Sequence, residues 1–98
     1  MTTDKRSITS HSKFSRPPGV LLREIDGELL LLNSSSDGYF GLNPTGAAMF
    51  QALVDGADVG QTVAAVGSEF AAPEEKIDED LRALITELVA NGLLTEAG

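Results

Sequence analysis

The chain has 98 residues, which fits one domain with a modest core and leaves little room for a deep active-site cavity. It contains no cysteine, which excludes disulfides, thiolate zinc sites and thiol nucleophiles. The formal net charge is −8 and is unevenly distributed: residues 1–23 carry five cations and one acid, whereas residues 24–98 carry two cations and fourteen acids.

The N-terminal residues 1–16 are polar, rich in Ser and Thr, and without hydrophobic periodicity. They lack the apolar core of a secretory signal, and no run in the chain is long enough to cross a bilayer. We therefore expect a cytoplasmic protein with no membrane partner. The next residues, Pro17-Pro18-Gly19, are typical of a turn or loop, and we expect ordered structure to begin after them. We predict a flexible basic tail over residues 1–17 and a folded domain over residues 18–96.

The first half of the domain has the pattern of three strands. Val20–Ile25 and Glu28–Asn33 are separated by Asp26-Gly27, a dipeptide typical of two-residue hairpin turns. A loop over residues 33–38 leads to Tyr39–Leu42, whose aromatic residues favour a third, short strand. The simplest arrangement is an antiparallel meander.

The second half has the signals of three helices. Gly residues predict the ends of the first and third helices, at Asp55-Gly56 and Asn91-Gly92. Favourable starting residues precede each helix: Asn43-Pro44, the capping box of Asp58 with Gln61, and Pro73 followed by Glu74 and Glu75.

Apolar residues at helical spacing predict the buried stripe of each helix. The order βββααα predicts an α+β domain similar to a winged helix-turn-helix, in which the second and third helices form the helix-turn-helix. We expect Leu93-Leu94 to fold back onto the core. The three predicted stripes are Ala47, Phe50, Leu53 and Val54, then Val59, Val63, Val66 and Phe70, then Ile77, Leu81, Leu84 and Leu88.

The sequence offers little of the chemistry that enzymes and metal sites need. His11 is the single histidine and lies in the predicted tail, and no glycine-rich phosphate-binding motif is present. The consecutive acids 78–80 point about 100° apart on a helix, so they cannot converge on one metal ion. We expect no catalytic residue, metal or cofactor. Opposite charges at i, i+4 spacing favour a solvated helix face instead: Lys76 with Asp80, and Asp78 with Arg82.

A helix-turn-helix is also the architecture of many DNA-binding regulators. The third helix, residues 73–91, carries six acids against Lys76 and Arg82. This charge would repel the phosphates that border a major groove. Nucleic acid is therefore disfavoured as a partner of the folded domain.

An open meander predicts a strand edge with unpaired N–H and C=O groups. A partner peptide could add there as a strand, with main-chain hydrogen bonds fixing its register and side-chain pockets providing selectivity. The residues alone fit an ordinary solvated edge strand equally well.

Most of the predicted domain resembles the PqqD family, named for a small protein of pyrroloquinoline quinone synthesis. The resemblance covers about residues 18–95 and excludes the tail. It rests on the run Asp37-Gly38-Tyr39-Phe40-Gly41-Leu42-Asn43-Pro44-Thr45-Gly46-Ala47, on Leu53-Val54-Asp55-Gly56 after the first helix, on residues 80–85, and on the ending Asn91-Gly92-Leu93-Leu94.

The resemblance implies a precursor-peptide recognition element, a winged-helix-like domain that binds the leader segment of a ribosomally made peptide and catalyses nothing. In such domains the leader adds as a strand beside the third strand, in a groove walled by the third helix. The domain then delivers the peptide to a modifying enzyme, such as a radical or cyclising enzyme, or to a leader peptidase. Stand-alone members include the leader-binding proteins of lasso-peptide pathways, which residues 42–47 resemble somewhat more.

Carried onto this sequence, the resemblance places the leader backbone along Tyr39, Phe40, Gly41 and Leu42. The helical wall depends on which flank of the third helix faces the peptide. We predict the flank made by Asp78, Arg82, Ile85 and Val89. The opposite flank, which the sequence does not exclude, is made by Lys76, Asp80, Ala83 and Glu87.

Two other functions stay open on the sequence. One is a winged-helix DNA-binding regulator, which the acidic body disfavours. The other is an enzyme subunit whose active site forms only with a partner chain. The sequence also leaves the oligomeric state open, because an exposed strand edge can pair with a second copy.

Overall fold

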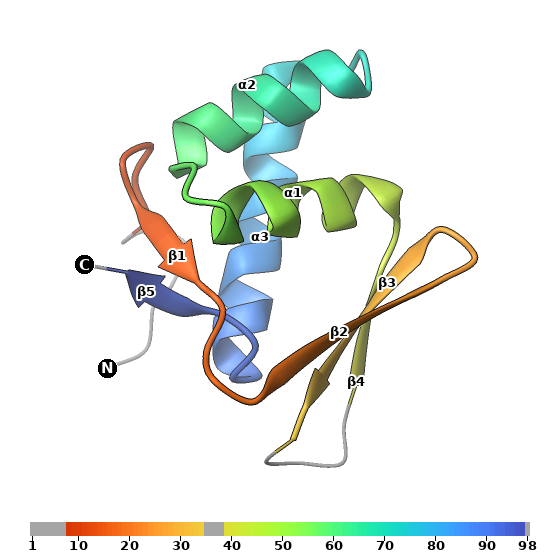
Figure 1. Ribbon diagram of the computed structural model, residues 1–98. Helices are drawn as coiled ribbons and strands as arrows, with labels where there is room; N and C mark the ends of the chain where they lie inside the picture. Colours follow the sequence, from red (N-terminus) through yellow and green to blue (C-terminus); the bar gives the residue numbers. More distant parts are fainter. Residues whose placement is uncertain (1–7, 35–38, 98) are drawn as a thin grey trace.

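The computed structural model describes residues 8–34 and 39–97, which form a three-stranded meander, three helices and a second, two-stranded sheet (Figure 1). The predicted order βββααα is confirmed for the central part of the chain. The elements are β1 (Lys13–Ser15), β2 (Val20–Ile25), β3 (Glu28–Asn33), β4 (Tyr39–Leu42), α1 (Pro44–Val54), α2 (Val59–Glu69), α3 (Glu74–Ala90) and β5 (Thr95–Ala97).

The meander has the strand order β2-β3-β4, and all of its pairs are antiparallel. The turn between β2 and β3 is the predicted one: Asp26 and Gly27 have φ values of 52° and 83°, as a type I′ turn requires. This turn aligns Ile25 with Glu28 and so sets the register of the whole hairpin. The predicted loop before β4 lies partly outside the described residues, because residues 35–38 are not among them.

The helix boundaries follow the predicted capping residues. The Asn43 side chain accepts a hydrogen bond from the Gly46 N–H at 2.8 Å, with Pro44 in the first turn of α1. Asp58 and Gln61 form the predicted reciprocal capping box at the start of α2. At the other end of the fold, α3 stops at Asn91, and Gly92 adopts a φ of 71°.

The core lies between the inner face of the meander and the helices. In Figure 1, α3 runs the length of the molecule, past α2 at one end and toward the small β1–β5 sheet at the other. The second predicted stripe is correct except for Phe70, which is 36% exposed because α2 ends at Glu69 and Phe70 occupies its C-cap. No helix among the described residues is long and apolar enough to span a membrane.

The main departure from the sequence prediction is an ordered segment that we call the N-terminal strap, residues 8–15. It was expected to belong to a flexible tail, yet Ile8 and Phe14 are each only 3% exposed in the core. Within it, β1 pairs antiparallel with β5, which follows the buried Leu93-Leu94. The strap was missed because a three-residue strand is too short to show periodicity and its two apolar residues are isolated among polar ones. The domain boundary predicted at residue 17 therefore falls inside the folded part.

The N-terminal strap also completes the hydrogen bonding of α2. The first N–H groups of a helix have no partner within the helix. Here the Val59 N–H donates to the Ser12 carbonyl at 3.0 Å, and the Gly60 N–H donates to the Ser10 carbonyl at 2.9 Å. The strap is thus held by backbone bonds as well as by burial.

We predict that Phe14→Ala lowers the free energy of unfolding by about 3 kcal/mol, because removing a buried aromatic ring leaves a cavity. Lys13→Ala, at an exposed position of the same strand, should change it by less than about 0.5 kcal/mol. Urea denaturation followed by circular dichroism measures both. Negligible effects for both variants would mean that residues 8–15 do not pack on the domain.

Candidate functional site

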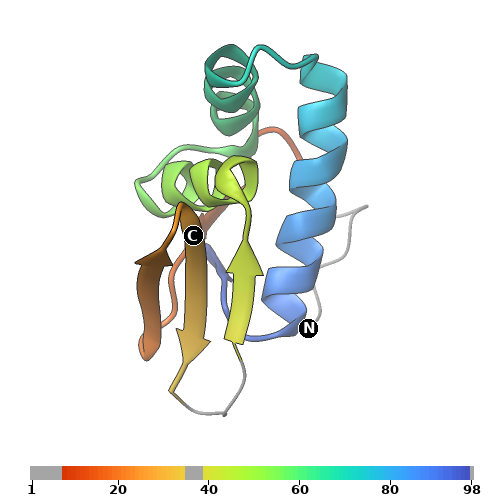
Figure 2. The same ribbon diagram turned by 90° about the vertical axis from the view of Figure 1, so that its right-hand side faces the viewer.

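A groove with a volume of about 360 Å³ lies between β4 and α3, and we call it the β4–α3 groove. Figure 2 shows β4 as the strand of the meander nearest to α3, with α1 above the strands. The lining comes from three parts of the fold: Phe40, Gly41 and Leu42 of β4, Asn43, Thr45, Gly46 and Met49 at and after the start of α1, and Asp80, Ala83, Leu84 and Glu87 of α3.

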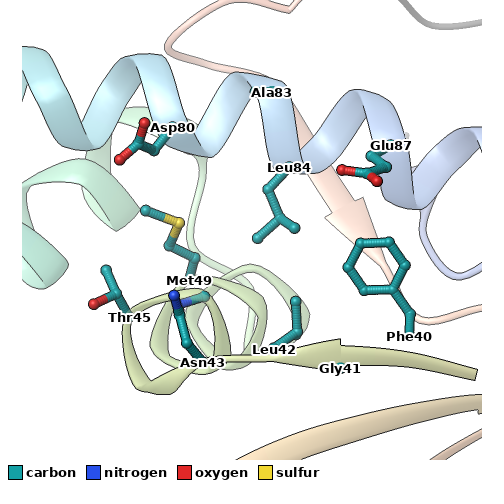
Figure 3. A pocket seen from close by; sticks show the side chains of 11 residues that line it. Phe40, Gly41, Leu42, Asn43, Thr45, Met49, Asp80, Ala83, Leu84 and Glu87 are labelled. Carbon is teal, nitrogen blue, oxygen red and sulfur yellow. The ribbon is translucent and has the colours of Figure 1, made fainter.

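The inner surface of the groove is apolar. Leu42 and Met49 are buried, and Phe40 and Leu84 are half-buried. Figure 3 shows Leu84 pointing from α3 toward β4, between the side chains of Met49 and Phe40. These four side chains, contributed by three different elements, offer a surface on which an apolar side chain of a ligand can pack.

The start of α1 packs closely against the end of β4, and this packing sets one end of the groove. Gly46 is buried in the first turn of α1, where a Cβ atom would lie 3.4 Å from the Leu42 side chain and 3.3 Å from the Asn43 side chain. The absence of a side chain at Gly46 therefore lets the helix follow the strand with almost no intervening loop.

The polar part of the groove is acidic, with Asp80 toward the α1 end and Glu87 toward the Phe40 end (Figure 3). Asp80 pairs with Lys76 at 3.2 Å, and both side chains are largely exposed. No cation among the described residues forms an ion pair with Glu87. The α3 wall consequently presents one paired and one unpaired carboxylate.

The hairpin turn determines which backbone groups of β3 face β2. In a two-residue hairpin the residues flanking the turn exchange both of their hydrogen bonds, and the bonded pairs then alternate along the strands. Ile25 and Glu28 form the first bonded pair. Ser34 comes six residues after Glu28, and its N–H donates to the Gly19 carbonyl at 3.0 Å, as the same alternation requires. Hence every second residue of β3, beginning with Glu28, is bonded to β2.

The remaining residues of β3 are bonded to β4. Leu29 is opposite Leu42, and Leu31 is opposite Phe40. The N–H and C=O groups of Phe40 and Leu42 therefore point toward β3. The backbone groups of Tyr39 and Gly41 point the other way, toward the open edge that borders the groove, which provides two positions for main-chain pairing with an added strand.

The structure brings the strand residues of the predicted site to the groove. Phe40, Gly41 and Leu42 line it. The Tyr39 side chain is 71% exposed and does not line the groove, because it alternates with Phe40 onto the other face of the sheet. Its contribution to the groove edge is its backbone.

The predicted helical wall lies elsewhere. None of Asp78, Arg82, Ile85 and Val89 lines the groove. The Arg82 side chain bonds to Asp78 at 3.0 Å and to the carbonyl oxygen of Ile8, so this flank contacts the N-terminal strap. Ile85 is fully buried, and Val89 packs against the core.

The opposite flank of α3 forms the wall instead. The groove is lined by Asp80, Ala83 and Glu87, and Lys76 forms an ion pair with Asp80. Leu84, predicted as core, lines the groove, while Ile85 takes its place in the buried stripe. Either residue can follow Leu81 on a helical stripe, at i+3 or i+4 spacing. The sequence does not distinguish the two positions, and in the structure Ile85 is buried whereas Leu84 is half-buried in the groove.

Residues from α1 were not predicted as part of the site. Asn43, Thr45, Gly46 and Met49 line the groove because α1 begins directly after β4. The absence of a loop between Leu42 and Pro44 was the signal that could have identified them. Among the described residues, no group of three or more His, Cys, Asp or Glu side chains is placed to hold a metal ion.

Residues 28–94 match the family described as coenzyme PQQ synthesis protein D (PqqD). The chain belongs to the PqqD family. The match extends from the first residue of β3 to the buried Leu94, so it includes all three elements that line the β4–α3 groove. Among curated proteins, no relative matches the chain.

Two solved structures are similar to this PqqD-family chain. One is TbiB1 in complex with the TbiA(beta) leader peptide, at 28% identity and a TM-score of 0.74, covering 82% of this chain and 93% of that chain. The other is lasso peptide synthetase B1 complexed with the leader peptide, at 29% identity and a TM-score of 0.76, covering 84% of this chain and 96% of that chain. Both similarities extend over most of each chain.

We predict that Ile85→Ala lowers the free energy of unfolding by about 3 kcal/mol, because it empties a site in the core. Leu84→Ala should lower it by about 1 kcal/mol or less, because Leu84 is half-exposed in the groove. Denaturant titrations of the two variants provide the comparison. A larger effect for Leu84 than for Ile85 would reverse the assignment of the two flanks.

Proposed function

We propose that this protein binds the leader segment of a ribosomally synthesised precursor peptide in the β4–α3 groove and presents it to a separate processing enzyme. The observation that carries the proposal is the open edge of β4. Its outward-facing backbone groups, from Tyr39 and Gly41, border an apolar groove of about 360 Å³. An extended peptide fits this arrangement, because its main chain can pair with the strand while its side chains enter the groove.

The solved relatives support the same ligand. Both similar chains were determined with a leader peptide bound, and this chain covers more than nine-tenths of each. The name of one of them, lasso peptide synthetase B1, also favours a lasso-peptide pathway over pyrroloquinoline quinone synthesis for this protein. A leader peptidase is then the processing enzyme that we expect the bound peptide to meet, in the cytoplasm where the precursor is made.

We further propose that the protein has no catalytic activity of its own. In the part of the chain that the structure describes, the groove lining contains neither His nor Cys, and its two carboxylates lie on one helix, two turns apart. This arrangement offers no nucleophile with an adjacent base. Its chemistry is suited to binding.

The helix-turn-helix of α2 and α3 gives little support to DNA binding. The two cations of α3, Lys76 and Arg82, are each paired with an acid of the same helix, at 3.2 Å and 3.0 Å. No free cation of α3 is left to contact a phosphate, and the acids of this helix would repel one.

Calorimetric titration with synthetic leader peptides, taken from short reading frames beside the gene, tests the proposal. We expect one leader segment to bind with one-to-one stoichiometry and the core segment of the same precursor not to bind. A folded protein that binds none of these leaders would contradict the proposal.

A pair of variants at Gly41 tests strand addition. Gly41→Pro removes an N–H that faces the open edge and leaves the β3–β4 pairing intact, so we expect affinity for the leader to fall about tenfold or more. Gly41→Ala keeps the N–H, and its Cβ would lie 3.5 Å from the Leu30 side chain, an ordinary contact. The Ala variant should therefore bind normally. If a folded Gly41→Pro variant binds like the wild type, the leader does not pair at this position.

A further inference from the structure

The charge of the β4–α3 groove restricts which leader sequences it can accept. Among the described residues, the charged groups in its lining are Asp80 and Glu87, and none of them is a cation. The two acids are seven residues apart on α3, which corresponds to about 10 Å along the helix axis. An extended peptide of several residues therefore passes both carboxylates.

The two carboxylates differ in how far their charge is already balanced. Asp80 has Lys76 at 3.2 Å, one turn away on α3. Glu87 has no such neighbour: the positions one turn before it are Ala83 and Leu84, and one turn after it are Ala90 and Asn91. No ion pair to Glu87 forms from any other described element. Glu87 is thus the uncompensated charge of the groove.

The surroundings of Glu87 favour a long cationic side chain. Figure 3 places Glu87 beside the ring of Phe40, at the end of the groove opposite Asp80. The methylene stem of a Lys or Arg can pack on an aromatic ring while its charged end reaches a carboxylate. An acidic residue at the same place would be repelled. Leu84 and Met49 lie farther along the groove and offer an apolar contact to a neighbouring ligand residue.

We propose that the leader segment recognised by this protein carries a Lys or Arg that pairs with Glu87, next to an apolar residue that packs on Leu84 and Met49. The inference rests on the proposed leader binding in the β4–α3 groove and adds the chemistry of the bound segment. Glu87 is then a specificity-determining residue, whereas Asp80 is already paired and contributes less.

The test uses the full-length protein and the synthetic leader that binds in the titration described above. We expect Glu87→Gln to weaken binding by roughly three- to tenfold and Glu87→Lys to weaken it further, because repulsion replaces attraction. Glu79→Lys is the matched control: it changes net charge equally, at an exposed position of α3 outside the groove, and should alter affinity by less than about twofold.

The leader side of the pair is identified by replacing each Lys and Arg of the peptide with Gln, one at a time. One replacement should weaken binding to the wild type and have no further effect on Glu87→Gln. A leader with Glu at that position should bind better to Glu87→Lys than to the wild type.

The outcomes separate this inference from the proposed function. Normal binding by Glu87→Gln and Glu87→Lys, together with lost binding by Gly41→Pro, would overturn the charge pairing. The proposed binding of the leader in the β4–α3 groove would still stand. Equal weakening by Glu87→Lys and Glu79→Lys would also overturn it, because net charge alone would then explain the effect. If no leader binds the wild type, the proposed function fails and this inference fails with it.

Discussion

The two-residue turn at Asp26-Gly27 is the constraint on which the geometry of the site depends. Both residues take positive φ values, and this turn fixes which pairs of the hairpin exchange hydrogen bonds. Alternate residues of β3 are bonded to β2 and to β4, and this alternation also decides which residues of β4 are bonded to β3. The backbone groups of Tyr39 and Gly41 therefore point toward the groove. A slip of one residue would instead present Phe40 and Leu42 at the edge and turn their side chains away from the core.

The N-terminal strap and the β4–α3 groove lie on opposite flanks of α3. The strap contacts one flank of the helix, where Arg82 donates a hydrogen bond to the carbonyl oxygen of Ile8, and Ile85 on the same flank is buried. The other flank, with Leu84 and Glu87, is left facing β4 across the groove. This arrangement predicts that binding and the packing of residues 8–15 involve opposite sides of the same helix.

Local signals in the sequence were sufficient for the meander and the helix boundaries. Asp26-Gly27 and the cap at Asn43 act within three or four residues, so their effects could be read without knowing the fold. The wall of the groove could not be predicted in this way. Leu84 and Ile85 both fit a helical stripe, and only the tertiary packing of α3 distinguishes the buried Ile85 from the half-buried Leu84. The family resemblance points to the strand that lines the groove, because its signature includes that strand, and the role of this strand in binding stays a prediction. The flank was inferred from helical angles alone.

Amide hydrogen exchange of β4, measured with and without the bound leader, tests the central claim most directly. The N–H groups of Phe40 and Leu42 are bonded to β3 and should be protected in both states. Those of Tyr39 and Gly41 face the open edge, and strand addition should slow their exchange only when the leader is present. A bound leader that leaves the Tyr39 and Gly41 amides unchanged would contradict strand addition at β4.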